Sequence, residues 1–195
     1  YTFVIVAGPV EPYFSSGRSK LRLKAEARYT RAASGGTGAA KTSGNYAGTL
    51  KPMAEAVTEG FDQILWLDGQ THQYAEEAGQ MNVFFRIGDE VITPELSGTI
   101  LPGVTRNTVI QLLSDWGYTV STRQVSIHEL RSASDAGVLN EMFGAGTAAV
   151  IAPIQSITFH DEELSVSAHT GSELSKRLLD TILGIQHGTI ADTHG

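Results

Sequence analysis

Two hydrophobic periods alternate along this chain, and this mixture limits its possible folds more than any other feature. In residues 20–29 apolar side chains alternate with mostly polar ones, which is the pattern of a half-buried strand. In residues 105–116 the apolar side chains recur every three or four positions, as in an amphipathic helix, and Gly117 follows as a stop signal. Interleaved strands and helices predict a mixed α/β or α+β fold, and we expect residues 1–195 to form one domain.

Further segments of both kinds are expected along the chain. Strands are predicted at residues 2–7, 63–67, 82–87, 90–93, 118–126, 147–154, 156–159 and 164–166. Helices are predicted at residues 50–59, 127–134 and 173–185, and Thr170 and Glu173 have the spacing of a capping box for the last helix. Gly60 is expected to end the first of these helices, and Gly88-Asp89 to form the turn of a hairpin.

Composition excludes several classes of protein. The net charge of −7 argues against a nucleic-acid partner or an anionic membrane surface. No apolar run approaches the roughly 20 residues that span a bilayer. The absence of cysteine excludes disulfides, thiolate metal sites and thiol nucleophiles, and it fits a cytoplasmic protein. Because the first residue is Tyr1 and an apolar run follows it, we expect the C-terminal portion of a longer chain.

The most informative stretch is GGTGAAKTSGNY, residues 35–46, which is dense in small residues and contains one lysine, Lys41. A P-loop would need glycine directly before the Lys-Ser/Thr pair, and Ala40 stands there. A dinucleotide fingerprint would need its third glycine where Lys41 stands. On these residues alone, a flexible surface loop with a solvated lysine is the commoner interpretation.

Three other loops have more than one interpretation. LPGVT at residues 101–105 opens a helix with a glycine, and free N–H groups at a helix N-terminus favour an anion, although Thr105 could simply be an N-cap. GAGTA at residues 144–148 suits a turn that enters a strand. HDEE at residues 160–163 could suggest a metal, but its spacing fits no ligand set and a turn is the better interpretation.

Several motifs, taken in order, resemble the fold type IV aminotransferases, and specifically the branched-chain enzymes, with the closest match to actinobacterial members. The motifs are GGTGAAK and GNY (35–46), WLD (66–68), EAGQMN (77–82), LPGVTR (101–106), FGAGTA (143–148) and GIQHG (184–188). The resemblance covers essentially the whole chain. It implies the large C-terminal domain of that family, a mixed-sheet pseudo-barrel with flanking helices, without the small N-terminal domain.

The resemblance implies pyridoxal 5′-phosphate as cofactor and assigns residues to it. Lys41 would form the Schiff base and shuttle a proton, Tyr46 would hydrogen-bond the phenolate oxygen, and Glu77 would keep the pyridine nitrogen protonated. Family spacing selects Glu77 over the neighbouring Glu76. The remaining cofactor contacts would come from Leu101, Gly103, Val104, Thr105, Gly146 and Thr147, and the substrate carboxylate would meet Thr147 and Ala148.

The implied activity is transamination between L-leucine, L-isoleucine or L-valine and 2-oxoglutarate, by a homodimer. D-amino-acid aminotransferase and aminodeoxychorismate lyase share the fold and remain alternatives. So does a non-catalytic fragment that serves as a binding or dimerisation module.

The chain also departs from the family pattern at some positions. Ala149 and Ala152 stand where mammalian members have a redox pair of cysteines, so no thiol switch is expected. Gln80 stands where some members have threonine. Arg31 lies near the lysine in both, and a structural ion pair is its expected use.

Overall fold

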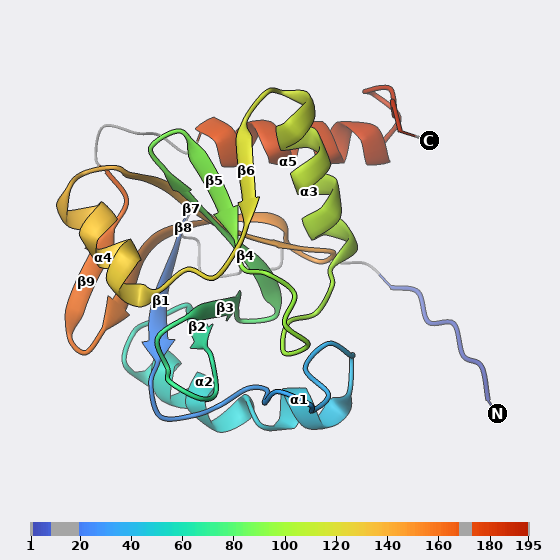
Figure 1. Ribbon diagram of the computed structural model, residues 1–195. Helices are drawn as coiled ribbons and strands as arrows, with labels where there is room; N and C mark the ends of the chain where they lie inside the picture. The colour runs from blue at the N-terminus through green and yellow to red at the C-terminus, as the bar shows by residue number, and fades with distance from the viewer. Residues whose placement is uncertain (1, 9–19, 168–172, 195) are drawn as a thin grey trace.

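The computed structural model describes residues 2–8, 20–167 and 173–194, and its elements surround one mixed β-sheet (Figure 1). The strands are β1 (Leu21–Glu26), β2 (Gln63–Leu67), β3 (Ala75–Ala78), β4 (Met81–Ile87), β5 (Glu90–Thr93), β6 (Thr119–Thr122), β7 (Leu139–Gly146), β8 (Val150–Phe159) and β9 (Glu162–Ser165). The helices are α1 (Ser43–Ala47), α2 (Leu50–Thr58), α3 (Val104–Asp115), α4 (Ile127–Asp135) and α5 (Glu173–Gln186).

The sheet closes on itself through β3. The strand order is β3-β2-β1-β8-β7-β4, and β4 pairs again with β3, so that these strands form a ring. β1 runs parallel to both of its neighbours, whereas the other neighbouring strands of the ring are antiparallel. β5 and β6 extend the sheet beyond β4, and β9 pairs with β8. The mixed-sheet barrel with flanking helices that the family resemblance implies is therefore confirmed.

Apolar side chains of the strands pack in two main clusters. Successive residues of a strand point to opposite faces, so Phe84 and Phe85 of β4 belong to different clusters. Phe85 packs in the cluster that joins the ring strands to α4. Phe84 stacks on Phe143 of β7, with 5.1 Å between ring centroids, in the cluster that includes α3 and α5. These two helices therefore cover one flank of the barrel (Figure 1).

The helices α1 and α2 form a separate layer beside β2. Ala56 of α2 is fully buried against Ile64 and Trp66 of this strand. As expected, α2 is followed by Gly60 in the left-handed conformation, with φ of 90°. The glycine-rich stretch with Lys41 leads from β1 into this layer. No helix in the described part of the chain is long and apolar enough to cross a bilayer.

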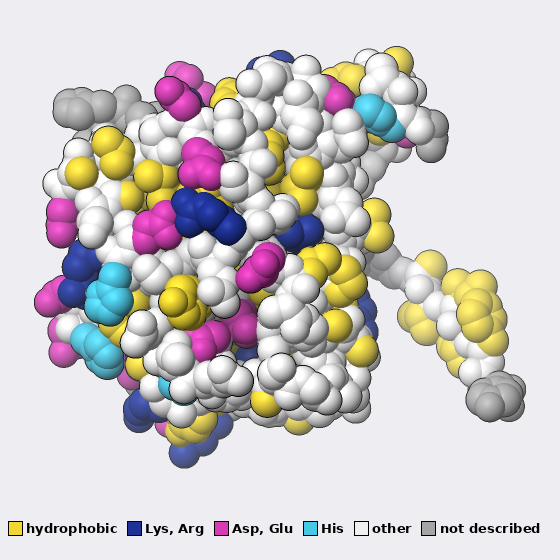
Figure 2. Space-filling view, viewed as in Figure 1, with side chains coloured by type: hydrophobic (Ala, Val, Ile, Leu, Met, Phe, Trp, Pro, Cys, Tyr) yellow, Lys and Arg dark blue, Asp and Glu magenta, His cyan; other side chains and the backbone are white. Residues whose placement is uncertain are grey.

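The prediction of a strand at residues 2–7 is wrong. The segment is extended but unpaired with any described residue, and it projects from the body of the molecule (Figure 1). Its apolar side chains lie open to solvent, with Phe3 88% exposed (Figure 2). Its β-branched composition suits a strand, but a strand forms only where another strand exchanges backbone hydrogen bonds with it.

Two observed strands were not predicted, and one boundary was misplaced. β3 has the polar sequence AEEA, yet all its residues are buried. It is paired on both sides, and Thr99 and Leu101 of the loop before α3 contact its two glutamates. β7 contains two glycines, and at Gly144 a Cβ would lie 2.7 Å from the Met81 side chain. The two strands predicted at residues 147–154 and 156–159 are one strand, β8, and residues 147–149 form the turn before it.

The remaining predicted elements occur near their expected positions. The strand predicted at residues 118–126 is shorter, and the helix predicted from residue 105 begins one residue earlier. In the HDEE segment His160 and Asp161 form the turn between β8 and β9, with φ of 47° and 65°, and the two glutamates begin β9. Thr170 of the expected capping box lies outside the described residues.

Candidate functional site

The glycine-rich loop turns sharply just before Lys41. The Ala40 N–H donates to the Thr37 carbonyl at 2.9 Å. The buried Asn45 side chain holds this turn closed, because its Nδ2 donates to the carbonyls of Thr37 at 2.8 Å and Ala40 at 2.9 Å. Its Oδ1 accepts the Thr37 hydroxyl at 2.7 Å. Asn45 was noted in the sequence only as part of a motif, and its function as a loop staple depends on these contacts.

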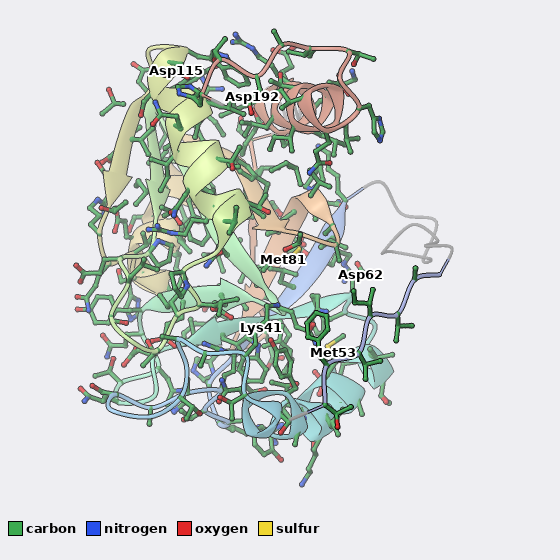
Figure 3. All side chains as sticks on the ribbon, turned by 90° about the vertical axis from the view of Figure 1, so that its right-hand side faces the viewer. Lys41, Met53, Asp62, Met81, Asp115 and Asp192 are labelled. Carbon is green, nitrogen blue, oxygen red and sulfur yellow. The ribbon has the colours of Figure 1, made fainter. Side chains whose placement is uncertain are left out.

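Gly38 allows the lysine loop to lie directly on the loop that precedes α3. A Cβ at Gly38 would lie 2.6 Å from the Thr99 Cα and equally close to the Ala32 Cβ. Any larger residue would therefore push the two loops apart. The exposed Lys41 follows this contact and lies between the α1–α2 layer and the strands (Figure 3).

Glu77 of β3 supplies a buried carboxylate beside this loop, and it is only 4% exposed. Its Oε1 accepts the Leu101 N–H at 2.7 Å, and its Oε2 lies 3.4 Å from Arg31 Nε. Burial raises the pKa of Glu77 to about 7, against the opposing effects of Arg31, the Leu101 N–H and Lys41. Such a carboxylate gains from any further cation or N–H donor that approaches it.

A hollow beside the lysine loop joins several of the predicted residues. Tyr46, Glu77 and Leu101 line it together with Arg31, Gln80 and Gly38. Lys41 is close enough for its charge to lower the pKa of Glu77. The structure thus places the tyrosine and the carboxylate that the sequence singles out in one hollow, and the lysine directly follows Ala40, which also lines it.

Asn82 fixes the loop that leads from this hollow to α3. It pairs with Glu77 across β3 and β4, and its Nδ2 donates to the Leu101 carbonyl at 2.9 Å. A Cβ at Gly103 would collide with the Asn82 Oδ1, so only glycine fits there. Asn82, like Asn45, has a structural task in the site that sequence reasoning did not assign.

The first turn of α3 faces solvent without a capping side chain. Its N-cap residue is Gly103, so the interpretation of Thr105 as the N-cap is wrong, because Thr105 lies inside the helix. Val104 is 80% exposed. Free N–H groups in a first helical turn are suited to bind an anion.

The turn between β7 and β8 lies beside this helix N-terminus. Thr147 lines a pocket of about 500 Å³ together with Val104 and Thr105. Gly146 pairs with Val150, and the exposed Thr147 and Ala148 lie in the turn between them. Val150 has φ of 56°, a strained conformation for a β-branched residue, and such strain clusters at functional sites.

The arrangement suits a flat ligand with an acidic group at one end. A buried carboxylate lines the hollow, and the loop that adjoins it carries the amine of Lys41. Beyond residues 101–103 lie the uncapped N-terminus of α3 and the turn with Thr147. The amine, the carboxylate and the helix N-terminus could bind an aldehyde, a protonated ring nitrogen and a phosphate, respectively. The described residues contain no cluster of three or more His, Cys, Asp or Glu side chains that could hold a metal.

Comparisons with known proteins agree with this chemistry. The family described as Amino-transferase class IV matches residues 1–157. Branched-chain-amino-acid aminotransferase 2 of Bacillus subtilis (strain 168) is 47% identical over 195 residues, which cover 100% of this chain and 54% of that protein. The branched-chain-amino-acid aminotransferase of Mycolicibacterium smegmatis is 42% identical over 199 residues, with 100% and 54% covered.

Solved structures give the same picture. A crystal structure of the branched-chain aminotransferase of Escherichia coli superposes with a TM-score of 0.80 at 26% identity, over 96% of this chain and 59% of that one. The T.th. branched-chain aminotransferase with pyridoxamine 5′-phosphate gives a TM-score of 0.76 at 27% identity, over 93% and 56%. The chain spans about half the length of the curated relatives that it matches.

Proposed function

We propose, from the premise that this chain belongs to the class IV aminotransferase family, that it is the cofactor-holding part of a branched-chain aminotransferase. Such an enzyme moves the amino group between L-leucine, L-isoleucine or L-valine and 2-oxoglutarate. The observation that carries the proposal is the juxtaposition of the Lys41 loop with the buried Glu77.

Pyridoxal 5′-phosphate is the cofactor that fits these residues. Lys41 would supply the amine that binds its aldehyde, and Glu77 would accept a hydrogen bond from its protonated ring nitrogen. The N-terminus of α3, with Thr105, and the β7–β8 turn, with Thr147, supply donors for its phosphate. When bound, the cofactor supplies the electron sink that stabilises a substrate carbanion. The relative solved with pyridoxamine 5′-phosphate supports this choice.

The residues around the ring each have a separate task in this proposal. Lys41 Nζ would take the proton from the substrate Cα and return it. For this the lysine side chain must reach from its exposed loop to the ring. The Tyr46 hydroxyl donates to the ring oxygen, and its half-buried position in the hollow with Glu77 supports this. Thr147 and Ala148 bind the substrate carboxylate from the exposed turn. Leu101, Gly103, Val104 and Gly146 complete the cofactor contacts.

Chemical trapping tests the assignment of Lys41. The full-length protein with pyridoxal 5′-phosphate is expected to gain absorbance in the near-visible region that borohydride abolishes. Peptide mapping is then expected to find the label on Lys41, and Lys41→Ala should take up none. A label on another lysine would contradict the assignment, and the absence of any spectral change would favour a non-catalytic binding module.

Substrate turnover distinguishes the related activities. We expect transfer from L-leucine to 2-oxoglutarate and none from D-alanine. D-alanine turnover would instead indicate a D-amino-acid aminotransferase, and pyruvate release from aminodeoxychorismate would indicate the lyase.

We also propose a cytoplasmic homodimer that has no nucleic-acid or membrane partner. The acidic net charge of −7 and the absence of cysteine support this environment, and the family resemblance supports the assembly. Light scattering of the full-length protein is expected to give twice the mass of one chain. A monomer mass would contradict the proposed assembly.

A further inference from the structure

Arg31 lies between three parts of the proposed site, and the chemistry described above gives it no task. It precedes the lysine loop, and its side chain is only 8% exposed. Its Nε lies 3.4 Å from Glu77 Oε2, and its Nη2 donates to the Thr99 carbonyl. One guanidinium therefore connects the lysine loop with β3 and with the loop before α3.

Thr99 is a fixed acceptor for this guanidinium. Its hydroxyl donates to Glu76 Oε1 at 2.5 Å and lies 2.7 Å from the Ser97 hydroxyl. Its backbone also lies against Gly38, where no side chain fits. The Arg31 head group is thus held at Nη2 by the Thr99 carbonyl, while its Nε lies toward Glu77.

Several groups act on the Glu77 carboxylate in this environment. Burial and the negative charge of Glu76 raise its pKa, whereas Arg31, the Leu101 N–H and Lys41 lower it. Arg31 has the largest of the three lowering effects. Lys41 has the smallest, and it is exposed to solvent, which screens its charge. Arg31 is therefore the cation on which the charge of Glu77 chiefly depends before a ring nitrogen arrives.

We propose that Arg31 is a positioning residue that holds the Glu77 carboxylate charged and directed at the cofactor ring while it docks the Lys41 loop on Thr99. This inference rests on the proposed function and deepens it. A purely structural ion pair would affect only the stability of the fold. A positioning residue also sets the pH at which Glu77 can accept a protonated ring nitrogen.

The test is the pH dependence of cofactor affinity in the full-length protein. Pyridoxal 5′-phosphate is titrated between pH 5.5 and 9 into wild type and Arg31→Met. Affinity is expected to rise with pH as Glu77 ionises. An opposite charge within about 4–6 Å lowers a carboxyl pKa by about 1–3 units, so Arg31→Met should move the midpoint up by at least about one unit. At pH 7 the dissociation constant should then increase about fivefold or more, because the ionised fraction falls from about 0.5 to about 0.1.

Two further variants separate charge from geometry. Arg31→Lys keeps the charge but cannot bridge to Thr99 as a planar fork, so its midpoint should lie between those of wild type and Arg31→Met. Arg28→Met is the matched control, because Arg28 is three residues away, 62% exposed, and pairs with Glu55 at 2.6 Å outside the hollow. Its midpoint should equal that of wild type.

The Glu77→Gln background keeps the test decisive if Arg31→Met does not fold. Arg31→Lys should shift the midpoint when Glu77 is present. In the Glu77→Gln background, which has no carboxyl to titrate, it should leave the pH dependence of affinity unchanged. An equal loss of affinity at every pH, or a shift that persists in that background, would overturn the proposal. If wild type neither binds the cofactor nor takes up label at Lys41, the proposed function itself has failed.

Discussion

Replacing Glu77 with glutamine is expected to remove a pH-dependent loss of stability from the cofactor-free protein. In the folded chain burial raises the pKa of Glu77 from its ordinary value of 4.5 to about 7. A raised carboxyl pKa means that the folded state binds the proton more tightly than the unfolded state. The associated stability is therefore complete below about pH 4.5 and is lost as the pH rises through about 7.

The size of the loss follows from the shift. A difference of about 2.5 pH units, at about 1.4 kcal/mol per unit, gives about 3 kcal/mol at pH 8. Because the Glu77 side chain is almost fully buried, solvent screening reduces this figure little. Glutamine is neutral at every pH, so the Glu77→Gln variant should not show this pH-dependent loss of unfolding free energy.

Urea unfolding of the cofactor-free protein at pH 5 and pH 8 measures the difference. Because a little of the loss has already occurred at pH 5, wild type is expected to lose about 2.5 kcal/mol more than Glu77→Gln between these values, since all other titrating groups are common to both. Asp68→Asn is the control, because hydrogen bonding lowers the pKa of Asp68 to about 2 and the group does not titrate in this range. Equal losses in wild type and Glu77→Gln would refute the argument that burial governs Glu77.

Two further predictions concern the loops around the site. Asp68 accepts the backbone N–H groups of Thr71, Gln73 and Tyr74, so Asp68→Asn should lower the free energy of unfolding by about 1–3 kcal/mol above pH 5 in urea titrations. That cost should shrink as the pH falls from about 4 to about 2, because a lowered pKa contributes stability only where the group is ionised. Gly38→Ala should reduce the melting temperature and the affinity for pyridoxal 5′-phosphate, whereas Gly44→Ala, where a Cβ meets nothing within 4 Å, should leave the melting temperature unchanged or raise it. Equal melting temperatures for the two alanine variants would contradict the close approach at Gly38.

The periodic elements of this fold could be predicted from the sequence because one neighbouring surface decides their pattern. Helix α3 and strand β1 each have such a pattern, and both were predicted. β3 could not be recognised, since its glutamates are buried by contacts with a loop about 23 residues further along the chain. The segment at residues 2–7 is the opposite case, in which a strand-like composition finds no partner among the described residues.

Some residues of the candidate site could also be predicted from the sequence, and others could not. Family resemblance, confirmed by the comparisons, led to Lys41, Glu77 and Thr147, whose roles stay predictions. The contacts of Asn45 and Asn82 could not be predicted, because they depend on where loops distant in sequence meet. Arg31 was expected to form a structural ion pair, and its position between Glu77 and Thr99 adds a connection that sequence spacing does not encode.

The short strand β3 closes the ring, and it is therefore also the place where the barrel is expected to open most easily. A closed barrel has no free edge, so it opens most easily where a short strand joins its two ends. β3 has four residues, and its pairing with β4 is made at Glu77 and Ala78. A ligand that binds Glu77 therefore also holds this seam shut. Cofactor binding should slow hydrogen exchange at the backbone amides of β3 more than at those of β5, which lies outside the ring.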